Sequence, residues 1–301
     1  MSKKIGHIHI DDTFYKGSDT YSDGSIEDEI LNIVRNDEDI DLLLQKDNRW
    51  PILYHFSPIR RNLLEWYNFS ENGTLLEIGA GCGAITGLFS EKLSQVTALE
   101  LSMRRAEILA NRHKKRENID IVVGDLFDVE MEQKFDYVTL IGVLEYAGLS
   151  GMENPFEKFL NKVKTFLKED GVLLIAIENK FGLKYWSGAA EDHSGIYFDS
   201  IENYHSTNHS VRTFSKKELK ELLGQCGFKQ LDFYYPVPDY KMPDEVFSDE
   251  FLPKAGEYNS VTPNYDRKRI SLFNEKLAMD SIVDNDMFDF FSNSFLIKCQ
   301  F

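Results

Sequence analysis

Between residues 74 and 177, short runs of apolar residues alternate with longer segments that have the spacing of amphipathic helices. The apolar runs lie at residues 74–78, 96–99, 119–123, 137–143 and 172–177, and the helical segments at 84–93, 104–113 and 156–167. Strands that are apolar throughout are buried on both faces, which is typical of a parallel sheet covered by helices. The alternation therefore predicts an α/β fold with a doubly wound, mostly parallel sheet.

The residues before this region predict a cover rather than a part of the sheet. Residues 1–25 are polar and rich in Gly, Ser and Asp, which predicts an irregular arm. A helix is expected after Ser25, which has Asp28 three residues later as in a capping box. A second helix is expected at 57–66, with a proline in its first turn.

The residues after this region predict further elements of the same sheet. A helix is expected at 215–224, and strands at 228–235 and 294–299 bring the sheet to seven strands. Residues 236–293 then form a large insertion before the last strand, and such long connections often serve as lids or binding elements. We expect an N-terminal arm and helical cover over residues 1–56 and one domain over 57–301.

Charge and cysteine content exclude several classes of protein. The 301 residues include 50 acidic and 34 basic side chains, which gives a net charge of −16. Nucleic acids and anionic membranes are bound through Lys and Arg, and the chain has no basic stripe. Its 3 cysteines have no CxxC spacing, so neither a disulfide framework nor a zinc site is supported. Without a visible signal peptide or a long apolar segment, we expect a cytoplasmic protein with no nucleic-acid partner and no membrane insertion.

A glycine-rich turn follows the first apolar run. It consists of Gly79, Ala80, Gly81, Cys82 and Gly83, placed where a positive φ and close approach of a ligand to the backbone are needed. The same turn satisfies the fingerprint of dinucleotide-binding folds, so NAD stays an alternative. Glu77, two residues before the turn, favours a ligand that is cationic at this end, because its carboxylate would repel a pyrophosphate.

Acidic residues also stand at the ends of the next expected strands. Glu100 closes the second strand, where it can accept hydrogen bonds from both hydroxyls of a ribose. Asp125 follows the third strand and can accept a hydrogen bond from an adenine amino group. Because the carboxyl ends of parallel strands meet at one edge of a sheet, we expect these side chains to surround one ligand.

Together these features resemble the successive motifs of class I S-adenosylmethionine-dependent methyltransferases. The motifs are Glu77-x-Gly79-x-Gly81-x-Gly83, Glu100, Gly124-Asp125 and Asp136-Tyr137-Val138-Thr139-Leu140. The resemblance implies a Rossmann-like methyltransferase fold and S-adenosylmethionine as the cofactor. It implies cofactor contacts from Tyr54, Arg60, Glu77, Gly79, Ala80, Gly81, Glu100, Leu101, Gly124, Asp125, Leu126 and Ile141.

Three shorter stretches resemble a narrower group, the bacterial methyltransferases found with surface-polysaccharide synthesis. They are residues 54–58, residues 177–186 and residues 238–241. This resemblance implies a sugar or a glycan-linked acceptor. Methylation of a small secondary metabolite on oxygen or nitrogen is the alternative.

Methyl transfer to a hydroxyl requires alignment of the oxygen and removal of its proton. The candidate catalytic residues are Glu145, Glu178 and His193, which follow the fourth and fifth strands of the alternation. His193 is the first choice as base, since a neutral imidazole beside a carboxylate titrates near neutral pH. Glu178 is expected to orient the substrate or the base.

Other acceptors and other functions would use different residues. A phosphate or carboxylate acceptor needs no base and would be bound by Lys180, Lys184 or Arg212. A metal site from His193, His205, His209 and Asp192 matches no compact ligand spacing, so no metal is expected. An NAD-dependent oxidoreductase and a non-catalytic module that binds the cofactor are the remaining alternatives. The sequence does not indicate an oligomeric state.

Overall fold

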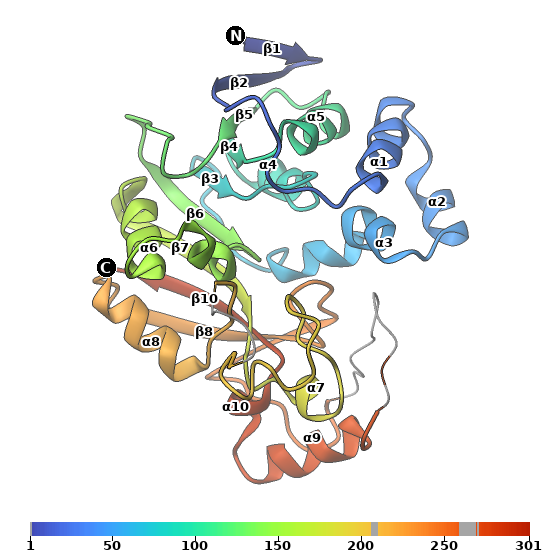
Figure 1. Ribbon diagram of the computed structural model, residues 1–301, viewed down its shortest axis with the longest axis vertical. Coiled ribbons are helices and arrows are strands. Elements are labelled where there is room, and N and C mark those ends of the chain that lie inside the picture. Colours follow the sequence, from blue (N-terminus) through green and yellow to red (C-terminus); the bar gives the residue numbers. More distant parts are fainter. Residues whose placement is uncertain (1, 206–209, 259–268, 270) are drawn as a thin grey trace. The chain divides into compact units, whose positions relative to one another are not determined.

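Figure 1 shows a computed structural model of the chain, which describes residues 2–205, 210–258, 269 and 271–301. The chain divides into two compact units. Unit 1 comprises Met1–Leu140 and Lys162–Val172, and unit 2 comprises Ile141–Asn161 and Leu173–Phe301. The described residues form ten strands, and each unit contains both strands and helices.

Unit 1 holds the parallel strands that the alternation predicts. Strand β3 (Thr74–Ile78) pairs in parallel with β4 (Gln95–Glu100) on one side and with β6 (Phe135–Ile141) on the other. Strand β4 continues in parallel to β5 (Ile119–Gly124). The strands that follow β3 in the chain therefore first extend the sheet on one side of β3 (β4, β5) and then on the other (β6). In parallel sheets with such a change of side, ligands bind outside the carboxyl ends of the strands at this point.

The N-terminal residues form two strands, so the irregular arm predicted for 1–25 is wrong over its first part. Strand β1 (Ser2–Ile5) pairs antiparallel with β2 (Ile8–Phe14), and β2 pairs in parallel with β5 at the edge of the sheet. Ile8 and Ile10 are fully buried. A short edge strand needs few apolar side chains, and the polar composition around these two concealed it. Residues 15–25 contain neither helix nor strand, as expected.

The helices of unit 1 only partly follow the prediction. Helices α1 (Ile26–Arg35), α4 (Thr86–Lys92) and α5 (Met103–Arg112) are confirmed, and α5 packs against α1, β2, β4 and β5. Ser25 precedes α1 but makes no side-chain cap hydrogen bond. The arm also contacts the N-terminal end of α5. There, Asp19 Oδ1 accepts a hydrogen bond from the Met103 N–H at 2.7 Å.

The region between α1 and β3 contains more helix than expected. Helices α2 (Ile40–Lys46) and α3 (Trp50–Phe56) were not predicted, and the helix expected at 57–66 is the 3-10 helix η1 (Pro58–Leu63). The helices α2 and α3 are each 7 residues long, which is too short for a clear amphipathic pattern. Helices α1 and α3 are held by an apolar cluster that includes Ile30, Ile52 and Ile108.

Unit 2 contains antiparallel pairs, so the sheet is mixed, whereas the pairs among β3, β4, β5 and β6 are parallel as predicted. Strand β10 (Ser294–Gln300) lies between β7 (Leu167–Glu178) and β8 (Gln230–Val237) and runs antiparallel to both. Strand β9 (Glu245–Ser248) pairs antiparallel with β8. All seven predicted strands are present, with β1, β2 and β9 in addition. A strand buried on both faces is apolar whichever way it runs, so its composition could not give its direction.

The helices of unit 2 include the best-capped one in the chain. Helix α8 (Lys216–Gln225) begins with a full capping box between Ser215 and Glu218. The predicted insertion, residues 236–293, contains β9, α9 (Glu275–Asp284) and α10 (Phe288–Phe291). Shorter elements are η2 (Leu144–Ser150) and α7 (Leu183–Trp186), and α6 (Pro155–Lys164) confirms another predicted helix.

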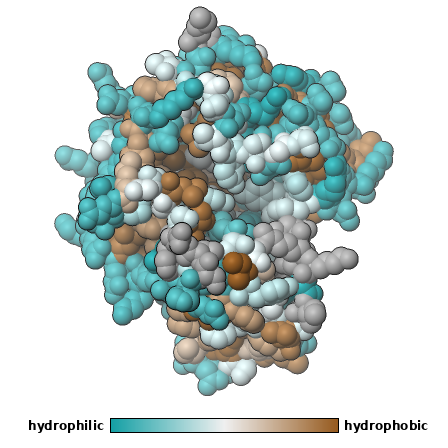
Figure 2. Space-filling model, viewed as in Figure 1, coloured by the Kyte–Doolittle hydropathy of each residue, from teal (hydrophilic) through white to brown (hydrophobic). Residues whose placement is uncertain are grey.

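The surface agrees with the acidic composition. On the face shown in Figure 2, most outer side chains are hydrophilic and the hydrophobic ones form small patches. Within the described residues, no helix combines the length and the apolar character that a membrane span requires. The domain boundary between residues 56 and 57 rests on the sequence alone and stays a prediction.

Candidate active site

The glycine-rich turn after β3 has a backbone that glycine adopts readily and other residues do not. The φ angle is 72° at Gly79, 56° at Gly81 and 74° at Gly83. The Gly79 and Ala80 N–H groups donate to the Leu99 carbonyl at 2.8 and 3.2 Å, which ties the turn to the end of β4. A Cβ built on Gly81 would meet no atom within 4 Å. The turn therefore leaves space for a ligand at Gly81.

Glu77 lies near the end of β3 and is only 5% exposed. Its Oε2 accepts a hydrogen bond from the Thr86 hydroxyl at 2.6 Å. Burial raises the pKa of Glu77 to about 8, although the Thr86 hydrogen bond and the charge of Arg60 act in the opposite direction. At neutral pH most of this carboxyl is therefore protonated, and a cationic ligand group next to it would favour the ionised form.

Arg60, in η1, is a buried cation with unused donors. Its guanidinium carbon lies 3.8 Å from the centre of the Tyr54 ring, which α3 supplies. Among the described residues, Nε and Nη1 of Arg60 have no hydrogen-bond partner. Buried donors without partners are costly, and a planar guanidinium is well suited to bind a carboxylate. Arg60 thus offers a site for a ligand carboxylate.

Glu100 closes β4 and is 4% exposed. Its Oε2 accepts the Gly81 N–H at 2.7 Å, and its Oε1 accepts the Ser102 N–H at 2.9 Å. A carboxylate has about four acceptor positions, so both oxygens can also accept hydrogen bonds from ribose hydroxyls. Glu100 thereby connects the turn to the predicted ribose position.

The residues after β5 and β6 have mixed environments. Asp125 Oδ1 accepts the Phe127 N–H at 2.8 Å, while Leu126 is buried and Leu101 is exposed. A Cβ on Gly124 would lie 2.6 Å from the Phe14 Cβ. Glycine at this position is thus required by the close approach of β2, whatever its contact with a cofactor. Ile141 is the first residue of unit 2.

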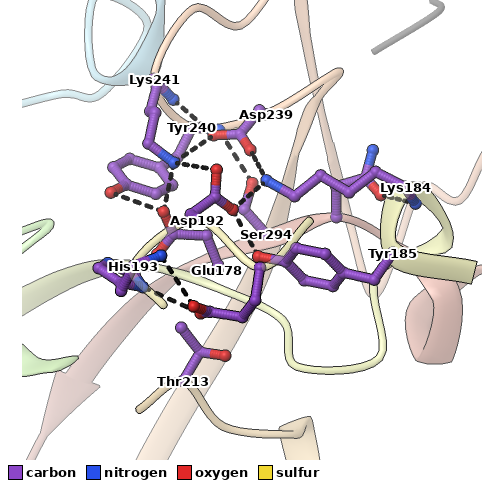
Figure 3. Close-up of polar contacts among 12 residues, drawn as sticks. Glu178, Lys184, Tyr185, Asp192, His193, Thr213, Asp239, Tyr240, Lys241 and Ser294 are labelled. Carbon is purple, nitrogen blue, oxygen red and sulfur yellow. Dashed lines mark hydrogen bonds and ion pairs between the residues drawn. The ribbon is translucent and has the colours of Figure 1, made fainter. Parts of the chain in front are cut away.

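Unit 2 brings together the three predicted catalytic residues. Glu145 comes from η2. Glu178 is the last residue of β7, and His193 lies in the loop after α7 (Figure 3). One ligating atom from each of the three lies within 4.8 Å of the other two. His193 Nε2 is 3.7 Å from Glu145 Oε1, and His193 Nδ1 is 3.0 Å from Glu191 Oε1. We refer to Glu145, Glu178 and His193 as the acidic-histidine cluster.

The acidic-histidine cluster is buried and incompletely hydrogen-bonded. Glu145 and Glu178 are 1% and 0% exposed, and Oε2 of each has no hydrogen-bond partner among the described residues. Burial raises the pKa of Glu145. Burial alone would lower the pKa of His193, but the neighbouring carboxylates of Glu145 and Glu191 outweigh it and hold this pKa well above its usual value. The sequence led us to expect a neutral imidazole, whereas these surroundings favour the imidazolium.

Two lysines, the buried Lys184 and the partly exposed Lys241, lie beside the acidic-histidine cluster (Figure 3). Lys184 Nζ is 2.7 Å from both Asp192 Oδ2 and Asp239 Oδ2. Lys241 forms an ion pair with Glu178 and lies 3.6 Å from Asp192 Oδ1. Asp239 and Lys241 were not predicted as site residues. The available signal was the stretch 238–241, whose resemblance to the narrower methyltransferase group gave no roles to individual residues.

The cations proposed for an anionic acceptor are paired with carboxylates. Lys180 Nζ and Arg212 Nη2 lie 3.3 and 3.0 Å from Glu218 Oε1, and Lys184 is paired as described. The structure therefore does not favour a phosphate or carboxylate acceptor at these residues. His209, considered for a metal site with His193 and His205, lies outside the described residues.

The residues of unit 1 fit S-adenosylmethionine. The unused donors of Arg60 match its carboxylate, and the buried carboxyl of Glu77 matches its α-amino group. The space at Gly81 allows the ligand to approach the backbone. NAD fits less well, because its pyrophosphate would lie next to Glu77.

A family model described as "Methyltransferase domain" matches residues 76–175. A ribosomal RNA small subunit methyltransferase A from Syntrophus aciditrophicus is 29% identical over 84 residues, which are 28% of this chain and 28% of that protein. An uncharacterized methyltransferase from Staphylococcus carnosus is 31% identical over 147 residues, 44% of this chain and 65% of that protein. The chain thus spans well under half the length of the ribosomal RNA methyltransferases that it matches.

Solved structures of methyltransferases are also similar. A possible histamine N-methyltransferase from Thermotoga maritima has a TM-score of 0.47 and 16% identity, over 83% of this chain and 92% of that one. Phosphoethanolamine N-methyltransferase 2 from Haemonchus contortus, in complex with S-adenosyl-L-methionine, has a TM-score of 0.47 and 17% identity, over 80% of this chain and 52% of that one.

Proposed function

We propose that this chain, which carries a methyltransferase domain of the class I S-adenosylmethionine-dependent type, methylates a hydroxyl oxygen of a sugar or glycan precursor. S-adenosylmethionine is its cofactor. When bound, this cofactor supplies an electrophilic methyl group that already carries its leaving group. The residues of the chain must then hold the cofactor, align the acceptor and remove the acceptor proton.

Unit 1 is proposed to hold the cofactor. Arg60 would bind the methionine carboxylate through Nε and Nη1, the buried donors that have no partner among the described residues. Glu77 would bind the α-amino group, and Glu100 would accept hydrogen bonds from the ribose hydroxyls. Asp125 and Leu126, after β5, would contact the adenine. Each contact uses a group whose chemistry matches one part of the ligand.

The acidic-histidine cluster is proposed to bind the acceptor, and a carboxylate of the cluster, Glu145 or Glu178, is proposed to take the acceptor proton, because the surroundings of His193 favour the imidazolium. The observation that carries this proposal is the pair of buried Oε2 atoms of Glu145 and Glu178, which have no hydrogen-bond partner among the described residues. Ionised carboxylates only accept hydrogen bonds, so they suit an acceptor that presents hydroxyl donors. A sugar presents several such hydroxyls on neighbouring carbons. Lys184 and Lys180 are held by carboxylates, which disfavours an anionic acceptor at these two lysines. Arg212 is also paired with a carboxylate, although its buried Nε has no partner among the described residues.

An amine acceptor is the second candidate. The same two carboxylate oxygens could hold an ammonium group, and the nitrogen would be methylated after losing a proton. The matched curated relatives named as ribosomal RNA methyltransferases suggest a third acceptor, but a net charge of −16 opposes binding to an RNA backbone.

We also propose a cytoplasmic location, since all 3 cysteines are free thiols.

The proposal is tested by transfer of radiolabelled methyl from S-adenosylmethionine into fractionated extract of the source organism. Label in lipid-linked or polymeric glycan, released as a methylated sugar on acid hydrolysis, is the expected result. Label confined to small amines would replace the glycan acceptor with an amine. Label in ribosomal RNA would overturn the acceptor that we propose. A Glu145→Gln variant provides the control, because label that enters equally with this variant does not come from the proposed site.

A further inference from the structure

We propose that Glu145, Glu178 and His193 bind a divalent metal ion that the acceptor hydroxyl contacts during the reaction. The three side chains come from η2, the end of β7 and the loop after α7, so the fold assembles them from distant parts of the sequence. One ligating atom from each lies within 4.8 Å of the other two. Metal–ligand bonds to such groups are about 2.0–2.2 Å long, so small side-chain rotations would complete the site.

The hydrogen bonds of the cluster leave the ligand atoms available. Oε2 of Glu145 and Oε2 of Glu178 are buried and have no hydrogen-bond partner among the described residues. His193 Nε2 is 3.7 Å from Glu145 Oε1, which is longer than a hydrogen bond. Each of the three residues can therefore give one atom to an ion without losing a hydrogen bond within the described structure.

The orientation of His193 is typical of a metal-binding histidine. Its Nδ1 is 3.0 Å from Glu191 Oε1, and Glu191 Oε2 accepts the backbone N–H of His193 at 2.8 Å and that of Ser194 at 2.6 Å. A carboxylate that accepts the Nδ1 proton fixes the ring and directs Nε2 toward the ion. Glu191 would thus act as a positioning residue.

The balance of buried charge also calls for a cation. Around the cluster, the carboxylates of Glu178, Asp192 and Asp239 pair with the ammonium groups of Lys184 and Lys241. The carboxylates of Glu145 and Glu191 lie next to His193. With all five carboxylates ionised, three negative charges are not balanced by the lysines, and a protonated His193 would balance one. A divalent ion that replaces the proton on Nε2 balances one charge more. Uncompensated charge in a buried position is costly.

The ligand types indicate which ions would bind. Carboxylates suit Mg²⁺ and Mn²⁺, and imidazole suits Zn²⁺ and Fe²⁺, so a mixed set favours Mn²⁺, Fe²⁺ or Zn²⁺ over Mg²⁺. Three protein ligands leave positions for the acceptor. An ion that contacts a hydroxyl oxygen lowers the pKa of the hydroxyl, and a polyol such as a sugar can fill two positions. This role of the ion rests on the proposed function, whereas binding of the ion does not.

The test is titration of the full-length, chelator-treated chain with MnCl₂, followed by electron paramagnetic resonance. We expect one tightly bound Mn²⁺ per chain, with a pulsed-resonance signal from a coordinated imidazole nitrogen. Glu145→Gln and Glu178→Gln should weaken binding by about 100-fold or more, and Glu191→Gln by about 10- to 100-fold. The exposed Glu153 provides the matched control, and Glu153→Gln should bind Mn²⁺ as the wild type does.

The inference is overturned if the wild-type chain shows no imidazole signal, a result that needs no variant to fold. It is also overturned if folded Glu145→Gln and Glu178→Gln variants bind Mn²⁺ as tightly as Glu153→Gln. Failure of the proposed function gives a different result from failure of the metal inference. If only the proposed function is wrong, Mn²⁺ binds with the imidazole signal but no sugar is methylated. If sugar is methylated at the full rate by a chain that binds no metal, only the metal inference fails.

Discussion

The two units of the molecule build their candidate sites by different means. In unit 1, the candidate cofactor residues follow one another along the chain at the ends of successive parallel strands, and the glycine turn is tied to β4 by backbone hydrogen bonds. In unit 2, the acidic-histidine cluster and its lysines come from η2, β7, α7, the loop after α7 and the insertion. The first arrangement depends on local geometry and the second on buried charges that pair over long distances in sequence.

This difference explains what could be predicted. Glu77 and Gly81 stand in a strand–turn–helix unit whose shape follows from neighbouring residues, and the bounds of β3, β4 and β5 were predicted to within one residue. Lys241 and Asp239 lie in a connection without a periodic pattern, and nothing in the sequence pairs them with Glu178 and Lys184. The antiparallel direction of β10 was not predicted for a related reason, because its pairing with β7 and β8 is also a long-range contact.

The contrast between the two units requires that the stability of unit 2 depends on its ion pairs. Lys184→Met removes the ammonium group that lies 2.7 Å from both Asp192 and Asp239. Removing the nearest cation of these two carboxylates should lower the free energy of unfolding by about 3 kcal/mol, measured by urea denaturation. The exposed Lys217, whose nearest carboxylate is Glu221 at 3.8 Å, is the control. Lys217→Met should cost less than about 0.5 kcal/mol, and an equal loss for both variants would contradict this view of unit 2.

The contribution of the glycine turn to cofactor binding can be separated from the strain that a side chain would cause at a positive φ. Gly81 and Gly151 both have positive φ, 56° and 65°, and a Cβ on either would meet no atom within 4 Å. Alanine at each position should therefore cost about 1–2 kcal/mol of stability. Only Gly81→Ala should also weaken S-adenosylmethionine binding, by about tenfold in calorimetry. Equal cofactor affinity in Gly81→Ala and Gly151→Ala would show that the ligand does not approach the turn.

The raised pKa of Glu77 provides a smaller but sharper test of unit 1. With a pKa of about 8, Glu77 is mostly protonated at pH 7, and the α-amino group of the cofactor should stabilise its ionised form. Binding should then release most of one proton at pH 7, and this release should disappear as the pH rises above 8, where Glu77 is ionised before the cofactor binds. Calorimetry in buffers of different ionisation enthalpy measures this number. Equal proton release by the Glu77→Gln variant at pH 7 would assign the proton to another group.

The most direct test of this division of work compares Glu77→Gln with His193→Asn. S-adenosylmethionine affinity is measured by calorimetry and methyl transfer by incorporation of label. We expect Glu77→Gln to weaken cofactor binding by at least about tenfold, because it removes a buried charge pair. His193→Asn should keep the affinity within about twofold and lower turnover by about 100-fold or more. Unchanged affinity in Glu77→Gln, or full turnover in His193→Asn, would contradict the separate roles of the two units.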